Sequence, residues 1–160
     1  MSHIQNLYQE MILEHNRNPR NFKKLDSCSH HSHGINPLCG DDYHLYIKME
    51  DNVIIDVGFE GQGCAISKSS GSLMSAAIKG KTAEEALSVK FAFMQLMKDE
   101  LDLEGIKQLG KLKIFEGVKQ FPVRVKCATL IWHALQDALD EKSLGQVTTE
   151  NQMEIGRAHV

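Results

Sequence analysis

The stretch from residue 43 to residue 59 reads YHLYIKMEDNVIIDVGF, and it decides the fold class. Residues 43–49 alternate between apolar and polar side chains, and residues 53–59 are rich in β-branched residues, so each segment predicts a strand. The polar triplet 50–52 between them suits a hairpin turn. We therefore expect an antiparallel strand pair here. Cys64-Ala65-Ile66 could add a third short strand, whereas residues 22–35, rich in Ser, His and Asn, predict a loop.

Helical periodicity surrounds this strand region. The first helix should end before Pro19, because the residue preceding a proline disfavours the α region. Thr82 and Glu85 have the spacing of a capping box, and Pro122 can occupy the first turn of the last helix. Glycines within residues 101–118 favour short helical turns over one long helix. The main expected helices cover residues 4–18, 67–79, 82–98 and 122–139.

Strands followed by helices indicate an α+β fold, with a small antiparallel three-stranded sheet and helices packed on one face. The 160 residues fit one domain, which we expect to cover residues 1–142. Residues 143–160 are polar and predict a loose C-terminal tail. The apolar stripe of the N-terminal helix could pack on the core or serve as a docking surface for a partner.

Charge and hydropathy exclude several classes of function. The net charge of −3 at pH 7 and the pI near 6.2 do not provide the excess positive charge that nucleic-acid-binding proteins carry. No stretch approaches the roughly 18 apolar residues of a membrane span, and no signal peptide is readable. We therefore expect a cytoplasmic protein. Thiols stay reduced there, so its four cysteines should be metal ligands, nucleophiles or core residues rather than disulfides.

Three cysteines and one aspartate form a candidate metal site. Cys39 lies in a Pro/Gly turn, Cys64 follows a Gly-Gln-Gly segment, and Cys127 lies near the start of the last helix, where free N–H groups would stabilise a thiolate. Asp41 could add an oxygen ligand from the same turn as Cys39. Thiolates with a carboxylate suit Zn²⁺. Without a Cys-x-x-Cys pair, spacing alone leaves three buried core thiols as an alternative.

Three strings of sequence favour the metal site over buried core thiols. They read NPLCGD at residues 36–41, FEGQGCAIS at residues 59–67 and RVKCATLIW at residues 124–132. In this order they resemble the IscU/SufU/NifU N-terminal family of iron–sulfur cluster assembly proteins, over roughly residues 7–139. Lys126 stands where IscU-type proteins carry a histidine, and the segment between Cys64 and Cys127 is longer, so the chain is most similar to the SufU type.

The resemblance implies a ligand set and a function. Cys39, Asp41, Cys64 and Cys127 would bind Zn²⁺, and Cys39 would accept persulfide sulfur from a SufS-type cysteine desulfurase, a pyridoxal-phosphate enzyme. In that family a histidine of the desulfurase replaces the first cysteine in the zinc shell. The sulfur would pass to a downstream scaffold or to apo-proteins. Such a chain is a sulfurtransferase-like partner rather than a stand-alone enzyme.

Other interpretations remain open from the sequence. The same ligands could assemble a transient [2Fe–2S] cluster, which would make the chain a scaffold, or hold a purely structural zinc ion. Arg124 and Lys126 could lower the pKa of nearby thiols or steer an anionic persulfide, although both are also ordinary helix-start cations. Cys28 lies outside the three strings, in a Ser/His-rich segment that favours a solvated loop.

Overall fold

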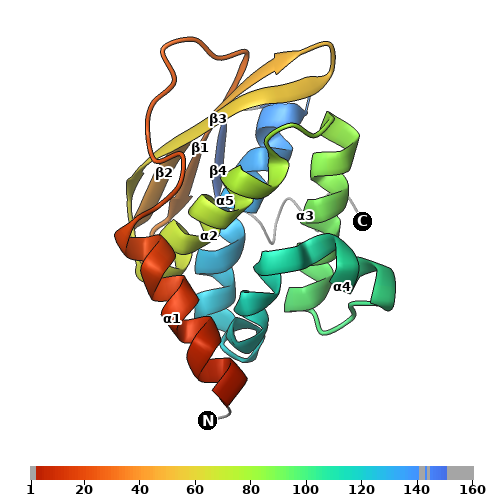
Figure 1. Ribbon diagram of the computed structural model, residues 1–160. Helices are drawn as coiled ribbons and strands as arrows, with labels where there is room; N and C mark the ends of the chain where they lie inside the picture. The colour runs from red at the N-terminus through yellow and green to blue at the C-terminus, as the bar shows by residue number, and fades with distance from the viewer. Residues whose placement is uncertain (1–2, 141–142, 144, 151–160) are drawn as a thin grey trace.

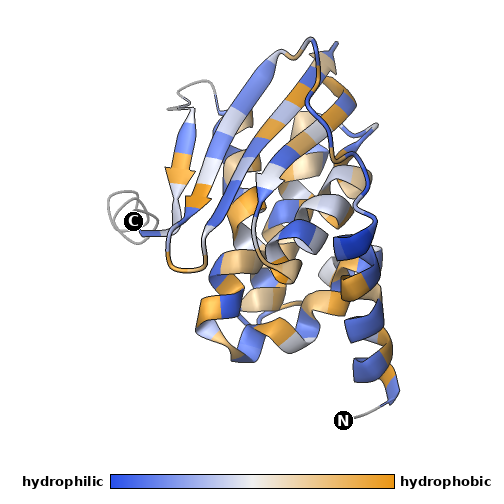
Figure 2. Ribbon diagram, turned by 90° about the vertical axis from the view of Figure 1, so that its left-hand side faces the viewer, coloured by the Kyte–Doolittle hydropathy of each residue, from blue (hydrophilic) through white to orange (hydrophobic). Residues whose placement is uncertain are grey.

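The predicted hairpin lies inside a four-stranded sheet, which packs with one face against the helices (Figure 1). The computed structural model describes residues 3–140, 143 and 145–150. Strands β2 (Asp41–Glu50) and β3 (Val53–Gln62) pair antiparallel, and β1 (His30–Asn36) pairs antiparallel with β2. The short strand β4 (Gln146–Thr148) pairs parallel with β1, which gives the order β3-β2-β1-β4. Figure 2 shows the sheet from its outer side, with the helices behind it.

The α+β class is confirmed, and the number of strands is corrected from three to four. Residues 30–35, expected in a loop, belong to β1, and Cys64–Ile66 is not a strand. Residues 146–148, expected in a loose tail, form β4, where Val147 is buried in the core. The last ten residues of that expected tail, 151–160, lie outside the described residues. The strand β1 escapes pattern-based prediction because its inward side chains are small or polar rather than apolar.

The helices agree more closely with the sequence. They are α1 (His3–Arg17), α2 (Ala65–Ile78), α3 (Ala83–Met97), α4 (Leu103–Leu109) and α5 (Pro122–Leu139), and a 3₁₀ segment η1 (Gly110–Gln120) precedes α5. Helix α1 ends before Pro19 as predicted. Both bonds of the predicted capping box join Thr82 to Glu85, and Pro122 occupies the first turn of α5. No helix among the described residues is long and apolar enough to cross a membrane.

Helix α2 is the central helix, and its small residues let its neighbours approach closely. A Cβ atom added to Gly71 would lie 2.7 Å from the ring of Phe59. The hydroxyl group of Ser70 donates to the carbonyl of Ala128 in α5 at 2.6 Å and accepts from the indole N–H of Trp132 at 3.2 Å. These contacts fix α5 against α2, and they therefore fix the position of Cys127.

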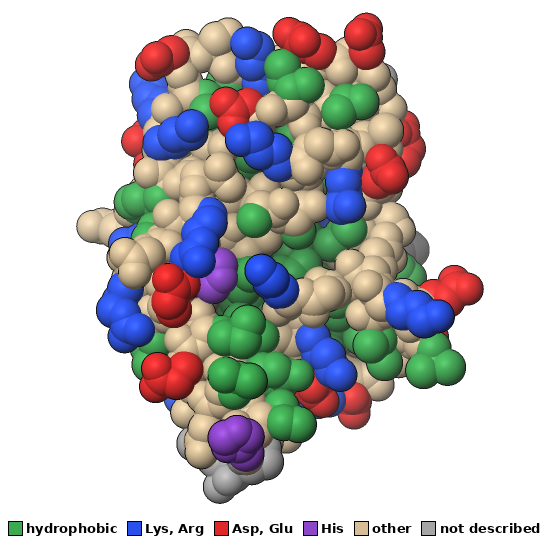
Figure 3. Space-filling model, viewed as in Figure 1, with side chains coloured by type: hydrophobic (Ala, Val, Ile, Leu, Met, Phe, Trp, Pro, Cys, Tyr) green, Lys and Arg blue, Asp and Glu red, His purple; other side chains and the backbone are tan. Residues whose placement is uncertain are grey.

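The aromatic part of the core lies between α3, η1 and α5. Trp132 stacks on Phe93 with ring centroids 4.9 Å apart, and Phe93 meets Phe115 edge to face at 5.8 Å. The predicted stripe of α1 is divided between core and solvent. Its members Tyr8, Met11 and Ile12 pack against the core, whereas Ile4 and Leu7 are more than half exposed. Figure 3 shows apolar side chains gathered on the surface towards the α1 end of the molecule.

Candidate metal centre

Three of the four predicted ligands converge where the β1–β2 turn meets α5. The ligand atoms of Cys39, Asp41 and Cys127 all lie within 4.8 Å of one another. Asp41 begins β2 and is 1% exposed, and Cys127 is 2% exposed. Cys39 lies in the four-residue turn that joins β1 to β2 and is half-buried. The turn, a strand and a helix each contribute one side chain, although Cys127 lies 86 or more positions along the chain from the other two.

Cys64 joins this group from the start of α2. It is the N-cap residue of that helix, and its sulfur accepts a hydrogen bond from the backbone N–H of Ser67 at 3.4 Å. Its own backbone N–H donates to Oδ1 of Asp41 at 2.9 Å. Cys64 is therefore the cysteine at a helix N-terminus, a role the sequence pattern suggested for Cys127. Cys127 lies in the second turn of α5, beyond the free N–H groups of the first turn.

The pKa values of Cys64 and Cys127 are shifted in opposite directions. A hydrogen bond with the Cys127 thiol lowers the pKa of Cys64 first of all, and contacts from the backbone and side chain of Ser67 lower it further. The pKa of Cys127 is raised, first by that same hydrogen bond with Cys64, then by burial, and then by a hydrogen bond with Cys39. Of these two thiols, Cys64 is therefore the more acidic, and Cys127 keeps its proton.

The carboxylate of Asp41 is held in one orientation by three donors. Its Oδ1 accepts from the Cys64 backbone and from the Ser67 hydroxyl at 3.0 Å, and its Oδ2 accepts from Nδ2 of Asn36 at 2.9 Å. The two oxygens of a carboxylate offer about four acceptor positions. One position thus stays available for a metal ion, and the other three fix the direction in which it points.

Three residues that the sequence analysis did not single out, Asn36, Ser67 and Tyr43, complete this shell. Asn36 is fully buried, and its Nδ2 also lies 3.5 Å from the sulfur of Cys127. The hydroxyl group of Tyr43 lies 3.1 Å from that of Ser67, and burial raises the pKa of Tyr43 so that its proton stays available for hydrogen bonding. Asn36 and Ser67 belong to the quoted strings, and this was the signal by which the sequence could have identified them. Tyr43 carried no such signal beyond its place in a predicted strand.

Gly63 leaves the space that this arrangement needs. A Cβ atom there would lie 2.5 Å from Oδ1 of Asp41, 2.6 Å from the hydroxyl of Ser67 and 2.7 Å from that of Tyr43. All three distances are shorter than real Cβ contacts. Residue 63 must therefore be a glycine because a larger side chain would overlap the Asp41 carboxylate. The Gly-Gln-Gly segment thus meets a packing requirement in addition to bending the backbone.

The other predicted residues belong to the start of α5 and to the loop before β1. Arg124 is exposed, and its guanidinium group lies over the ring of Phe121 at 4.5 Å. Lys126 is half-buried one residue before Cys127, and Cys28 is exposed in the loop before β1. The main influences on the pKa values of Cys64 and Cys127 come from the thiols themselves, burial, Ser67 and Asp41. A supporting role for Arg124 or Lys126 stays a prediction.

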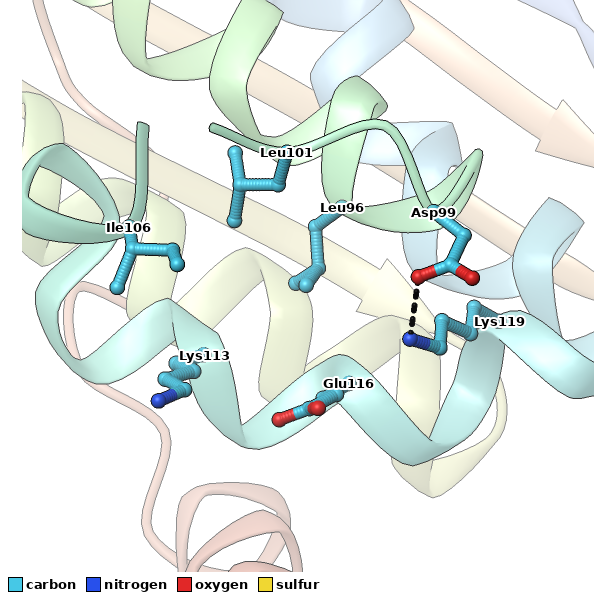
Figure 4. Close-up of a pocket in the computed structure, with 7 residues that line it drawn as sticks. All are labelled: Leu96, Asp99, Leu101, Ile106, Lys113, Glu116 and Lys119. Atoms are coloured by element: carbon cyan, nitrogen blue, oxygen red, sulfur yellow. Dashed lines mark hydrogen bonds and ion pairs between the residues drawn. The ribbon is translucent and has the colours of Figure 1, made fainter. Parts of the chain in front are cut away.

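A separate pocket of about 130 Å³ opens between the end of α3, α4 and η1. Figure 4 shows the apolar side chains of Leu96, Leu101 and Ile106 on one side and an ion pair between Lys119 and Asp99, 2.8 Å long, on the other. The pocket belongs to the long segment between Cys64 and Cys127. None of the four predicted ligands lines it, so it is not part of the metal centre.

Comparison with known proteins shows the family to which the chain belongs. The model of the NifU-like N-terminal domain matches residues 7–128. The chain is 38% identical to the zinc-dependent sulfurtransferase SufU of Bacillus subtilis, over 90% of this chain and 97% of that protein. It is 33% identical to the iron–sulfur cluster assembly scaffold protein IscU of Streptococcus pyogenes, over 98% of each chain.

A solved structure shares the fold at comparable identity. The crystal structure of a SUF-system iron–sulfur cluster assembly scaffold protein from Fervidobacterium islandicum superposes with a TM-score of 0.79 at 36% identity, covering 88% of this chain and all of that one. The N-terminal NifU-like protein of Brucella abortus gives a TM-score of 0.76 at 28% identity, over 89% of this chain. Sequence, fold and the clustered thiols together place the chain in the NifU-like N-terminal domain family of SufU- and IscU-type iron–sulfur cluster assembly proteins.

Proposed function

We propose that this chain accepts sulfur on Cys39 from the persulfide of a SufS-type cysteine desulfurase, next to a zinc ion held by Cys39, Asp41, Cys64 and Cys127. The observation that carries the proposal is the convergence of Cys39, Asp41 and Cys127 within 4.8 Å, with Cys64 hydrogen-bonded to the same carboxylate. A relative of matching length is named a zinc-dependent sulfurtransferase, which supports this choice within the family.

The donor set fits zinc. Three sulfurs and one carboxylate oxygen make four donors, the number that zinc takes in tetrahedral sites, and thiolates are among its preferred ligands. When bound, zinc would keep its cysteine ligands in the thiolate form at neutral pH. The hydrogen bonds from Asn36 and Ser67 orient the carboxylate in advance, so little conformational freedom is left to lose on binding.

Cys39 is the thiol best placed to react. Cys64 caps one helix and Cys127 is buried inside another, whereas Cys39 lies in a turn, between the 62% exposed Leu38 and a glycine with a positive φ of 71°. Movement of Cys39 therefore disturbs neither a helix nor a strand. Exposed apolar side chains at Leu38, Phe121 and Val123 flank the ligands in sequence and offer a partner apolar surface there.

The transfer step needs no oxidant. The Cys39 thiolate attacks the outer sulfur of the donor's persulfide and forms a new S–S bond. The S–S bond to the donor cysteine breaks, and that cysteine leaves as a thiolate. Cys39 then carries the persulfide, and the sulfur can pass by the same exchange to a downstream scaffold or an apo-protein.

A desulfurase assay tests this proposal. The purified protein is mixed with a SufS-type desulfurase and cysteine, turnover is followed, and mass spectrometry locates any added sulfur. Cys39→Ser should abolish both stimulation of turnover and the persulfide on this chain. Cys28→Ser, which removes an exposed cysteine outside the site, is the matched control and should behave as wild type. Unchanged turnover with Cys39→Ser would leave only a structural role for the metal.

The second candidate is a scaffold on which a [2Fe–2S] cluster forms on the same ligands. The names of the IscU relatives favour it, and cysteine thiolates are suitable cluster ligands. The histidine that precedes the third cysteine in IscU-type proteins is Lys126 here, which favours sulfur transfer instead. After metal removal, reconstitution with iron and sulfide followed by transfer of an intact cluster to an apo-ferredoxin would decide for the scaffold.

A further inference from the structure

A cluster of histidines lies on the outer face of the sheet, on the side away from the thiols. His31 and His33 come from β1, and Asp42 and His44 come from β2. We call these four residues the outer cluster. Side chains alternate between the two faces of a strand. The inward positions Asp41 and Tyr43 are each 1% exposed, whereas the side chain of Asp42 is 48% exposed and that of His33 is 25% exposed.

Strand register brings the four side chains together. His33 lies directly opposite His44 in the antiparallel pair, and His31 and Asp42 are placed diagonally on either side of that couple. Directly opposed residues have Cβ atoms about 5 Å apart, and diagonal neighbours are within reach of long side chains. The outer cluster is thus a compact quartet on a rigid sheet rather than a set of loop side chains.

The side chains in the outer cluster already touch through their ligand atoms. Nε2 of His33 lies 2.5 Å from Oδ1 of Asp42, and Nε2 of His31 lies 2.9 Å from Nδ1 of His44. The rings of His33 and His44 stack with centroids 4.1 Å apart and planes 9° apart. The ligand atoms of His33, Asp42 and His44 all lie within 4.8 Å of one another. Two nitrogens and one carboxylate oxygen therefore converge on one small volume.

The chemistry of the donor set favours a transition-metal ion. Neutral imidazole is the form that binds metal ions, and imidazole with carboxylate suits divalent ions such as Zn²⁺, Co²⁺, Ni²⁺ and Cu²⁺.

We propose that the outer cluster is a second metal site, in which His33, Asp42 and His44 bind a divalent transition-metal ion. The ion would replace the contact between His33 and Asp42 with bonds to one centre. Nothing in this site uses the thiols, because Asp41 and Asp42 are consecutive residues that point to opposite faces of β2. The folded protein should therefore bind two ions independently.

Cobalt spectroscopy separates the two sites. Protein loaded with one equivalent of Zn²⁺ is titrated with Co²⁺, and absorption is followed. Wild type should bind one further equivalent with visible d–d bands but without the near-ultraviolet sulfur-to-cobalt band of a thiolate site. His33→Gln/His44→Gln should weaken this second binding at least about tenfold. His30→Gln, a neighbouring histidine on the opposite face of β1, is the control and should bind as wild type.

Two further variants test the carboxylate ligand and the independence of the outer cluster from the thiols. Asp42→Asn keeps the size of an exposed side chain and should weaken Co²⁺ binding without changing the thermal unfolding midpoint. Cys39→Ser should leave the second binding intact, which separates it from the thiol site and from the proposed sulfur transfer. If wild type takes up no second equivalent, or if His33→Gln/His44→Gln binds it as tightly as wild type does, the outer cluster is only a set of cross-strand hydrogen bonds.

Discussion

The hydroxyl group of Thr149 donates a hydrogen bond of 2.9 Å to Oδ1 of Asn36, across 113 positions of the chain. Asn36 in turn donates through Nδ2 to Asp41 and reaches the sulfur of Cys127. The segment after α5 is therefore connected to the metal centre through one buried amide. Both ends of that amide have partners, so it has a single favourable orientation.

Replacement of Asn36 should weaken both fold and metal binding. Asn36→Ala leaves Oδ2 of Asp41 and the Thr149 hydroxyl without their partners in a buried position. A buried polar group that loses its partner costs about 1–3 kcal/mol, and loss of an orienting contact lowers metal affinity about 10–100-fold. Urea unfolding and zinc competition against a chromophoric chelator measure the two effects. Gln108→Ala, which removes an exposed helical amide bonded to Ser88, is the control. Unchanged zinc affinity in Asn36→Ala would contradict the orienting role.

Truncation should show that β4 belongs to the folded unit. A chain that ends at residue 144 loses the buried side chain of Val147 and the bond from Thr149, and we expect the free energy of unfolding to fall by about 2 kcal/mol or more. A chain that ends at residue 150 keeps both contacts and serves as the matched control. Equal stability of the two chains in urea unfolding would show that β4 contributes nothing to the fold.

Gly63→Ala tests the packing requirement at the metal centre. The added methyl group would overlap Oδ1 of Asp41 and the hydroxyls of Ser67 and Tyr43, so we expect a loss of about 1–3 kcal/mol in stability and clearly weaker zinc binding. Gly117→Ala is the comparison, because nothing lies within 4 Å of the added atom there, and its stability should change by less than about 1 kcal/mol. Both variants are followed by thermal unfolding with and without zinc. Equal zinc affinities for the two variants would refute the overlap.

The protein should lose stability in mild acid partly through His133. Burial first, and nearby Lys90 second, lower the pKa of His133 to about 4. In the unfolded chain a histidine titrates near pH 6.5. Between these values the unfolded state binds more protons than the folded state, so stability that is present at pH 7 declines as the pH falls from about 6.5 to about 4.

His133→Gln should remove this contribution. The variant should lose roughly 2 kcal/mol less stability than wild type between pH 7 and pH 4, an amount that allows for the partial exposure of the ring. Urea unfolding at several pH values, at equal metal load, measures it. His3→Gln, an exposed histidine at the start of α1, should follow the wild-type curve. Parallel curves for His133→Gln and wild type would show that His133 does not titrate in this way.

Strong periodicity explains which elements could be predicted from the sequence. The β2–β3 hairpin and the long helices carry apolar residues at regular spacing, because each has one face in the core. The strand β1 lacks this signal. Its inward positions are Ser32, Gly34 and Asn36, and a Cβ at Gly34 would already lie 3.3 Å from Leu130 of α5. The close approach of α5 requires small residues there, and they remove the alternation that predicts a strand.

The convergence of three predicted ligands agrees with the sequence, but the geometry of the site could not be predicted from it. The quoted strings and the family resemblance selected Cys39, Asp41 and Cys127, whose ligand atoms lie together. Metal binding by these residues and Cys64 stays a prediction. The N-cap position of Cys64 could not be read from the strings, since the Cys-Ala-Ile triplet is equally compatible with a strand. The connection from Thr149 to Asn36 depends on the parallel pairing of β4 with β1 across the whole domain, and such long-range pairing leaves no local pattern.

Partner recognition is constrained by how the sheet ends. At one edge, which β3 forms, the backbone N–H groups of Phe59 and Ile54 donate hydrogen bonds to the carbonyl groups of Asn21 and Lys81. At the other edge β4 covers part of β1 and is itself only three residues long. Short or covered edges resist the addition of a foreign strand. A protein that docks at the thiols of this chain should therefore contact side chains around the turn at residues 37–40 instead of extending the sheet.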